Sequence, residues 1–322
     1  MERTKINIAV CFDAGFVMPT GVMLYSACVN TPDTDIDFHL VMDESVSEKD
    51  KEALVKTIEL FAGKRALFYD ISSQTYINFP FCNKDRLTRS TYIRLFLTEI
   101  LPQSVEKILY LDGDCIVRHS LLPLWNIDIS TYAIGAVFDV SEGDIEYYNR
   151  LRYPMALGYF NAGVALINLA YWRQIGAPKL FADYLEQHSD RVKHEDQDVM
   201  NVIFNDKKLF IPAKYNLQIF FCWKGTPWWD YWKHENELSE AFEDPSIIHF
   251  TGEDKPWIVH RRAVTPYSST FYKYQKQTVW AGIKIDHRTP LRRLRNYVGD
   301  WLRRIGMLKP LSSRYKNMPP VD

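Results

Sequence analysis

Short apolar runs alternate along this chain with longer segments in which apolar residues recur at helical spacing. The runs that predict strands are Ile6–Phe12, Ile36–Met42, Ala66–Asp70, Lys107–Leu111, Ala133–Phe138, Ala162–Asn168 and Ile247–Phe250. The segments that predict helices are Gly21–Asn30, Ser47–Ala62, Thr91–Ile100, Leu180–Ser189 and Asp196–Phe204. Apolar strands that alternate with helices are typical of a largely parallel sheet covered on both faces. We therefore expect an α/β fold with ligands bound beyond the carboxyl ends of the strands.

The chain after Pro290 follows a different pattern. Apolar residues recur at helical spacing at Leu291, Leu294, Val298, Trp301, Leu302 and Ile305. Arginines flank them at positions 292, 293, 295, 303 and 304. The pattern predicts a basic amphipathic helix, which either packs on the domain or lies on an anionic membrane surface. We expect a domain over residues 1–283 and a basic tail over residues 284–322.

Charge separates these two parts of the chain. The formal net charge is -1, but residues 284–322 hold ten Lys and Arg against three acidic residues, so the tail carries +7 and the remainder -8. An overall balance near zero does not favour nucleic acid as a partner. The basic tail instead favours the inner membrane surface.

Cysteine usage and the length of the apolar segments indicate a compartment. The chain has five cysteines, an odd number, and no two stand at metal-ligand spacing, as is typical of proteins in a reducing cytosol. The first apolar run is too short for a signal peptide, and no segment approaches about eighteen uninterrupted apolar residues. We expect a cytoplasmic protein that associates peripherally with a membrane.

Two aspartates follow directly on the apolar run Lys107–Leu111. Asp112 and Asp114 flank Gly113, so in an extended backbone their side chains point the same way. Two such carboxylates repel unless protons or a cation neutralise them, and carboxylate oxygens suit Mg²⁺ or Mn²⁺. Gly113 lets a ligand approach the backbone. The alternative interpretation is an ordinary turn or solvated loop.

A second candidate segment begins at His249, at the end of a short apolar strand. Its imidazole would complete a site with the two aspartates and would shift the preference from Mg²⁺ towards Mn²⁺. Gly252 permits a tight turn, and Lys255 can meet a diphosphate as a point charge. Alternatively, His249 is structural and Lys255 is a surface cation.

Three further segments carry polar or aromatic residues. Tyr159–Val164 contains Asn161, and His194–Asn201 is an acidic cluster at the start of a predicted helix. Each has an ordinary explanation, a turn for the first and N-capping for the second. The aromatic residues between positions 220 and 232 either offer rings on which a ligand stacks or pack as a loop.

Six motifs follow one another along the chain: Asn7-Ile8-Ala9-Val10-Cys11-Phe12-Asp13, Thr91-Tyr92-Ile93-Arg94, Leu109-Tyr110-Leu111-Asp112-Gly113-Asp114, Phe160-Asn161-Ala162-Gly163, Asp196-Gln197-Asp198, and His249-Phe250-Thr251-Gly252 with Lys255-Pro256-Trp257. In this order they resemble glycosyltransferase family 8, and in particular bacterial lipopolysaccharide glucosyl- and galactosyltransferases. The resemblance covers roughly residues 5–280. It implies a GT-A type, single Rossmann-like domain. It also implies retaining transfer of glucose or galactose from a UDP-sugar to a saccharide or glycolipid acceptor, such as the lipopolysaccharide core.

The resemblance also implies roles for individual residues. The ligands of Mn²⁺, or of Mg²⁺ in its place, would be Asp112, Asp114 and His249. The nucleotide would lie against Val10, Cys11, Phe12, Asp13, Leu87, Asp112, Gly113, Gly252 and Lys255. The donor sugar would lie among Arg94, Asp139, Asn161, Asp196 and Gln197, of which Gln197 and Asp196 are the catalytic candidates.

One position departs from the family pattern, and the route to retention stays open. The family usually follows its first strand with Asp, a variable residue, Asn and an aromatic residue, whereas Gly15 replaces that Asn here. A side-chain contact to the nucleotide is therefore expected to be missing.

Retention needs either a covalent intermediate or attack from the leaving-group face. Gln197 is a poor nucleophile and Asp196 a better one, and we favour same-face attack in which a UDP oxygen accepts the acceptor's proton.

Three other functions compete with this interpretation. Aspartyl-phosphate phosphatases also carry D-x-D after a strand, but usually after the first strand and with Thr or Val where Ile116 stands here. A nucleotide-sugar-binding protein without turnover would keep the same polar residues. A self-glucosylating, glycogenin-like enzyme would modify a tyrosine of its own, and the chain has 19.

Overall fold

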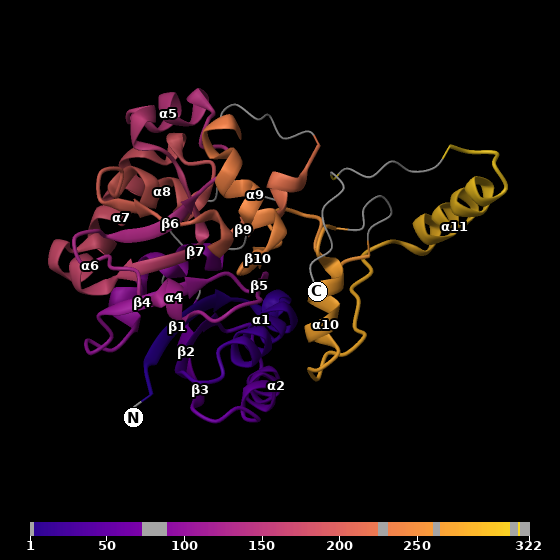
Figure 1. The fold of residues 1–322 in the computed structure, drawn as a ribbon, viewed down its shortest axis with the longest axis horizontal. Coiled ribbons are helices and arrows are strands. Elements are labelled where there is room, and N and C mark those ends of the chain that lie inside the picture. The colour runs from indigo at the N-terminus through magenta and orange to yellow at the C-terminus, as the bar shows by residue number, and fades with distance from the viewer. Residues whose placement is uncertain (1–2, 73–88, 225–230, 260–264, 310–314, 316–322) are drawn as a thin grey trace.

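The computed structural model describes residues 3–72, 89–224, 231–259, 265–309 and 315, and a central sheet lies between its helices (Figure 1). The strands are β1 (Lys5–Phe12), β2 (Asp35–Asp43), β3 (Lys64–Ile71), β4 (Lys107–Leu111), β5 (Cys115–Val117), β6 (Ile134–Phe138), β7 (Phe160–Asn168), β8 (Lys208–Phe210), β9 (Leu217–Gln218) and β10 (Ile247–His249). The larger sheet has the order β3-β2-β1-β4-β7-β6-β8. Within it β7 is antiparallel to β4 and β6, and the other pairings are parallel. The expected α/β fold with a mostly parallel sheet is confirmed.

Helices cover both faces of this sheet. The helices of the described residues are α1 (Val17–Asn30), α2 (Glu48–Ile58), α3 (Leu97–Ile100), α4 (Leu122–Trp125), α5 (Ile145–Leu151), α6 (Leu169–Ile175), α7 (Ala177–His188), α8 (Glu195–Ile203), α9 (Glu235–Glu243), α10 (Ser268–Gln275) and α11 (Pro290–Arg304), of which α11 lies apart from the sheet (Figure 1). Alternate side chains of β4 enter two different cores. Leu109 and Leu111 share one core with residues of α1, whereas Ile108 and Tyr110 share the other with residues of α7 and α8. Burial on both faces explains why β4 is apolar from Ile108 to Leu111.

A second, smaller sheet brings distant parts of the chain together. Its strand order is β5-β10-β9, with β10 antiparallel to β5 and parallel to β9. His249, the last residue of β10, pairs with Cys115 on one side and with Gln218 on the other. Asp114 directly precedes β5, so this small sheet sets His249 beside the end of β4.

The sequence pattern located strands better than it located the ends of helices. Each of the seven predicted strands overlaps a strand of the structure, and Ser47 caps α2 through a capping box with Asp50, as expected for an N-cap. The helix predicted from Gly21 begins at Val17 instead, because Pro19 is tolerated in a first helical turn. The helix predicted over Thr91–Ile100 is mainly a 3₁₀ helix, η3 (Arg89–Phe96), followed by the short α3.

The predicted tail helix is α11, which stands away from the body of the molecule (Figure 1). The chain around it is tied to the body at two points. Ile285 forms a bridge with Ile258, and Tyr315 forms one with Trp223. Tyr315 is 5% exposed and belongs to the same core as α1. Among the described residues, no helix combines the length and the apolar composition that a membrane span requires.

Candidate functional site

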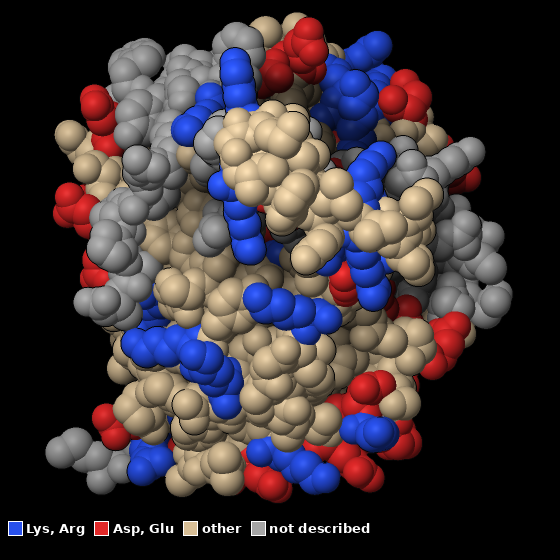
Figure 2. Space-filling model, turned by 90° about the vertical axis from the view of Figure 1, so that its right-hand side faces the viewer, with Lys and Arg blue, Asp and Glu red and all other residues tan. Residues whose placement is uncertain are grey.

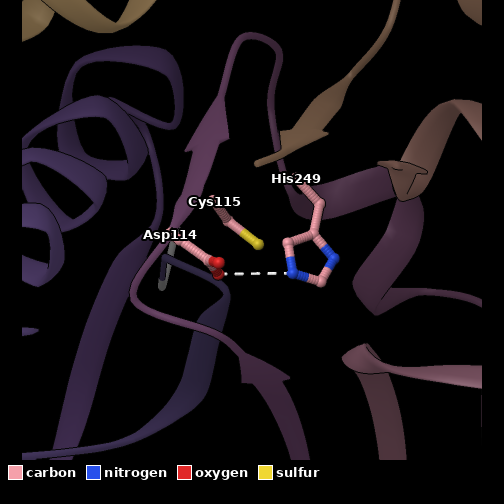
Figure 3. A group of neighbouring side chains, drawn as sticks. All are labelled: Asp114, Cys115 and His249. Carbon is pink, nitrogen blue, oxygen red and sulfur yellow. Dashed lines mark ion pairs between the residues drawn. The ribbon is translucent and has the colours of Figure 1, made fainter. Parts of the chain in front are cut away.

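Asp112 and Asp114 follow β4 and converge on His249. The backbone N–H of Asp112 donates to Gly163 on the neighbouring β7, at 2.7 Å, and the carbonyl of Asp114 accepts from Phe250, at 3.0 Å. These bonds hold both carboxylates at the junction of the two sheets. Nε2 of His249 lies 3.2 Å from Asp114 Oδ1 and 3.6 Å from Asp112 Oδ2. The structure therefore brings together the three residues expected to bind a metal, and Figure 3 shows the ion pair between Asp114 and His249.

Two glycines allow this close approach. A Cβ atom at Gly163 would lie 2.1 Å from His249 Cε1 and 2.6 Å from Asp112 Oδ2, so only glycine fits there without moving the site. At Gly113 a Cβ atom would lie 2.3 Å from the hydroxyl of Thr20 on α1. Gly113 therefore gives room to α1, a packing role that the sequence pattern did not predict.

Lys255 is a cation of this site. Its ammonium forms an ion pair with Asp114 Oδ2 and also donates to the carbonyl of Phe250. Although burial alone would raise it, Lys255 and His249 together hold the pKa of Asp114 well below its usual value. The alternative that Lys255 is an ordinary surface cation is wrong, since its side chain is only 13% exposed.

The turn before Lys255 is built around Gly252. Its φ of +77° is in the left-handed region that favours glycine, and a Cβ atom there would lie 2.4 Å from the ring of Phe220. Phe220 is 37% exposed and its ring centroid lies 6.3 Å from that of Trp223, which is 40% exposed. Two rings of the predicted aromatic run thus lie exposed beside the Gly252 turn. Residues 225–230 of that run lie outside the described residues.

The chemistry of the three ligand candidates fits a divalent cation. Asp114 Oδ1 is buried and receives no hydrogen bond within the described chain, although a carboxylate oxygen needs a partner. Two carboxylates and one imidazole form a donor set that suits Mn²⁺. The thiol of Cys115 also lies close, since its sulfur and the nearest ligand atoms of Asp114 and His249 are within 4.8 Å of one another (Figure 3). Burial raises the pKa of this thiol well above its usual value in the absence of a cation.

Arg94 links Asp112 to the acidic start of α8. Its guanidinium lies 2.8 Å from both Asp112 Oδ1 and Asp196 Oδ2, and it donates to the carbonyl of Ala162 at 3.0 Å. The ring of Tyr110 lies 4.3 Å beneath it, and the Tyr110 hydroxyl donates to Asp112 at 2.9 Å. Burial raises the pKa of Asp196 to about 7, against the opposing effect of Arg94. Arg94 thus holds two carboxylates that would otherwise repel each other.

Asp139, Asn161 and Gln197 form a second polar group. Asp139 Oδ2 accepts from Asn161 Nδ2 at 2.9 Å and from Gln197 Nε2 at 3.3 Å. Gln197 also accepts from the backbone N–H of Ala162 at 3.0 Å and donates to the hydroxyl of Tyr159 at 3.1 Å. All five residues expected around the donor sugar therefore join two hydrogen-bonded groups, and both groups contact the backbone of Ala162.

Sequence reasoning missed Asn216, which connects the second group to His249. Asn216 is fully buried between η6 (Ala213–Tyr215) and β9. Its Nδ2 donates to Asn161 Oδ1, and its Oδ1 lies 2.9 Å from His249 Nδ1. The sequence offers only a weak sign of this role, a single amide residue between the apolar Tyr215 and Leu217.

The expected nucleotide residues at the end of β1 differ in exposure. The side chains of Val10 and Phe12 are buried in the core, so any nucleotide contact there would have to come from the backbone. Cys11 is half-buried near Arg94, and burial raises its pKa to about 12. Asp13 caps a short 3₁₀ helix by accepting from the N–H of Gly15 at 2.9 Å. Leu87 lies outside the described residues.

Comparisons with known sequences agree with this arrangement. Residues 7–260 match the sequence model described as Glycosyl transferase family 8. The lipopolysaccharide 1,3-galactosyltransferase of Salmonella typhimurium is 26% identical over 289 residues, which are 87% of this chain and 80% of that protein. General stress protein A of Bacillus subtilis is 26% identical over 287 residues, 87% of this chain and 96% of that protein. The lipopolysaccharide 1,2-glucosyltransferase of Escherichia coli K12 is 28% identical over 274 residues, 83% of this chain and 76% of that protein.

Solved structures are similar over most of the chain. The galactosyltransferase LgtC, crystallised in complex with donor and acceptor sugar analogues, matches with a TM-score of 0.76 and 27% identity, covering 85% of this chain and 96% of that one. The glycosyltransferase GlyE of Streptococcus pneumoniae matches with a TM-score of 0.61 and 21% identity, covering 85% of this chain and 60% of that one. The second likeness concerns the fold alone.

Proposed function

Because this chain belongs to glycosyltransferase family 8, it is a glycosyltransferase, and we propose that it moves glucose or galactose from a UDP-sugar to a saccharide acceptor with retention of configuration. The observation that carries this proposal is the convergence of Asp112, Asp114 and His249 around Gly163. Neither a phosphatase nor a simple turn needs an imidazole set against two carboxylates. The similarity to LgtC over 85% of the chain supports a nucleotide-sugar donor and a saccharide acceptor.

We propose Mn²⁺ as the cofactor, with Mg²⁺ as the weaker alternative. Asp112, Asp114 and His249 would hold the ion, and its imidazole ligand favours Mn²⁺ over Mg²⁺. A bound divalent cation supplies charge stabilisation for a departing diphosphate. Lys255 is paired with Asp114 and would place a second positive charge beside the same diphosphate. The turn at Gly252 would leave the backbone of Gly252 accessible to it.

The side chains around the proposed sugar position favour same-face attack. Gln197 has its amide oxygen on the backbone N–H of Ala162, so that oxygen is not free to act as a nucleophile. Asp196 is 3% exposed and its carboxylate is paired with Arg94. A covalent intermediate would require one of these bonds to break. Asp139 and Asn161 would instead orient the sugar hydroxyls, while a UDP oxygen accepts the acceptor's proton.

The acceptor is proposed to be a cell-surface glycan or glycolipid. Two of the relatives above are lipopolysaccharide transferases, whereas the name of General stress protein A mentions no acceptor, so these names support a saccharide without fixing which one. The exposed rings of Phe220 and Trp223 beside the Gly252 turn would give a sugar ring a surface for stacking.

We propose that α11 docks the enzyme on an anionic membrane surface. Leu291, Tyr297 and Trp301 on this helix are 77%, 73% and 53% exposed, which leaves a large apolar surface in contact with water. Lys and Arg side chains gather on the side of the molecule that carries it (Figure 2). Apolar side chains beside basic ones suit lipid headgroups above an acyl region. The domain boundary at residue 283 remains part of this proposal.

A panel of UDP-hexoses assayed for hydrolysis and transfer with Mn²⁺ tests the proposed activity. We expect UDP release with UDP-glucose or UDP-galactose, and a loss of at least about 100-fold in Asp112→Asn or Asp114→Asn, since each substitution removes a charged ligand. Full activity in either variant would contradict the metal assignment. Glu186→Gln, an exposed carboxylate on α7, is the matched control.

Two further measurements, made beside the UDP-release assay, separate the competing functions. Binding of UDP and Mn²⁺ by calorimetry without any UDP release would identify a nucleotide-sugar-binding protein. A rise in intact mass after incubation with UDP-glucose would identify self-glucosylation. Release of UDP with an unchanged protein mass supports transfer to an external acceptor.

A further inference from the structure

A chain of hydrogen bonds runs from Asp139, beside the proposed sugar position, to His249 at the proposed metal position. It passes through two buried amides, Asn161 and Asn216. Asn161 is 8% exposed and Asn216 is fully buried, so neither amide can exchange these partners for water. Each amide has one donating end and one accepting end, so the direction of each hydrogen bond in this series follows from the one before it.

The first amide is fixed by partners that have only one role. The backbone N–H of Gly163 can only donate, and it lies 3.0 Å from Asn161 Oδ1. An ionised carboxylate can only accept, and Asp139 Oδ2 lies 2.9 Å from Asn161 Nδ2. The oxygen of Asn161 must therefore face Gly163 and Asn216. A flipped Asn161 would set its NH₂ group against an N–H and its oxygen against a carboxylate.

The second amide inherits this orientation. Because Asn161 presents an oxygen, Asn216 must present its NH₂ group there, at 2.9 Å. Its own oxygen then faces His249 Nδ1, at 2.9 Å, and an oxygen acceptor requires the proton to be on Nδ1. In the neutral imidazole the lone pair is then on Nε2, the atom that would meet a cation held by Asp112 and Asp114. The ion pair with Asp114 belongs to the protonated form of the same ring.

From this geometry we infer that Asn216 is a positioning residue that fixes the tautomer and ring orientation of His249 for metal binding. The inference rests on the proposed function for its biological meaning, but the tautomer itself is a property of the chain without any ligand. A metal-binding histidine commonly depends on such a partner at its other nitrogen, and loss of that partner costs about 10- to 100-fold in metal affinity.

Two substitutions at position 216 test the inference. Asn216→Leu is close in shape but offers no acceptor, so we expect loss of the Nδ1–H preference and Mn²⁺ binding weakened by about 10- to 100-fold. Asn216→Asp keeps an acceptor for Nδ1–H, so the tautomer should persist and Mn²⁺ affinity should fall less than in the leucine variant. A purely structural role predicts that the two variants differ in stability alone.

The tautomer is read from long-range ¹H–¹⁵N correlations of ¹⁵N-histidine-labelled, metal-free protein, at a pH well above the ordinary imidazole pKa. The His249 signal is assigned from its absence in His249→Gln. Mn²⁺ affinity is measured separately by electron paramagnetic resonance of the free ion, without any sugar nucleotide. The matched control is Asn168→Leu, which removes a hydrogen-bonded amide at the opposite end of β7 and should change neither reading.

Each outcome bears on the inference. An Nε2–H tautomer in the wild-type protein, or an Nδ1–H tautomer and unchanged Mn²⁺ affinity in Asn216→Leu, would overturn it. If Asn216→Leu does not fold, loss of the Nδ1–H tautomer in Asn216→Asp would overturn it as well. If the wild-type protein shows the expected tautomer and binds Mn²⁺ yet releases no UDP from any UDP-hexose, the proposed function fails while the inference stands.

Discussion

Gly163 lies on β7 with its α-carbon against the imidazole of His249. We predict that Gly163→Ala weakens Mn²⁺ binding and UDP release by at least about 100-fold, because the new methyl group must push aside His249 or Asp112, both within 2.6 Å. Mn²⁺ titration followed by a UDP-release assay measures both effects.

The neighbouring strand offers a matched control for this substitution. Gly135 lies on β6, where an added Cβ atom would meet the side chain of Ile129 at 3.1 Å and no residue of the candidate site. Gly135→Ala should therefore alter stability and leave Mn²⁺ affinity unchanged. Equal Mn²⁺ affinities in the two alanine variants would mean that Gly163 is not needed for the geometry of the site.

Glu195 opens α8 with an unusual backbone and a buried carboxyl group. Its φ is +38°, its side chain is 1% exposed, and no hydrogen bond reaches either carboxyl oxygen from the described residues. Burial, with Asp196 and Asp198 nearby, raises the pKa of Glu195 to about 8. An unfolded glutamate ionises near about pH 4.3, so above that pH the unfolded chain releases a proton that the folded chain keeps.

The contribution of Glu195 to the stability of the folded protein should therefore fall as the pH rises from about 4 to about 8. We predict that Glu195→Gln reduces this decline, by up to about 1.4 kcal/mol per pH unit, since a neutral amide does not titrate. Urea unfolding at a series of pH values measures the difference, with the exposed Glu186→Gln as the control. Parallel curves for wild type and Glu195→Gln would show that the buried carboxyl ionises normally.

At the scale of elements, apolar continuity made the long strands predictable and, among the short strands, revealed only β10. β4 matched its predicted bounds because both of its faces are buried. β5, β8 and β9 have only three, three and two residues, too few to show a period. The pairing of β10 with β5 and β9 was missed for this reason, although the small sheet brings His249 to the aspartates.

The candidate site was predictable where residues carry charge and less so where they carry only amides. Asp112, Asp114 and His249 stand at the ends of predicted strands, which made them candidate ligands, although the small sheet that joins them was not predicted. Asn216 lies before a strand of two residues, and nothing in the local pattern separates it from an ordinary turn residue. Long-range hydrogen bonds of this kind leave no periodic trace in a sequence.

The basic charge of α11 is the property of this element that the proposed membrane binding depends on. We predict that reversal of Arg292, Arg293 and Arg295 to Glu weakens binding to phosphatidylserine vesicles by at least about 100-fold, since each basic residue near such a surface contributes about 1 kcal/mol. Vesicle co-sedimentation at low and high salt gives the partition coefficients.

The matched control places the same change of charge on the body of the protein. Lys49, Lys56 and Lys207 are exposed there, and their reversal to Glu should leave most vesicle binding intact. Substitution is a cleaner test than deletion of the tail, because Ile285 and Tyr315 are bonded to the body and a deletion would remove both. Equal losses in the two triple variants would argue against α11 as the docking element.

At the scale of the whole molecule, the candidate site lies at the junction of the two sheets. Binding of Mn²⁺ and UDP across this junction should stabilise the fold, by about 2.7 kcal/mol at a ligand concentration one hundred times the dissociation constant. We predict a rise in melting temperature that is absent in Asp114→Asn, measured by calorimetry with and without both ligands. An equal rise in the variant would place the ligands elsewhere.

The segment that carries α11 leaves the body at Ile285 and meets it again at Tyr315, whose hydroxyl donates to Asp254 at 2.9 Å. A segment held at both ends permits far less tumbling than a free tail would. Asp254 directly precedes Lys255, so the returning anchor lies beside the proposed diphosphate position. An enzyme docked in this way would hold its reaction centre at a set height above the bilayer. It would then select glycolipids by how far their terminal hydroxyl stands from the lipid, so acceptors with spacers of graded length should be used at graded rates.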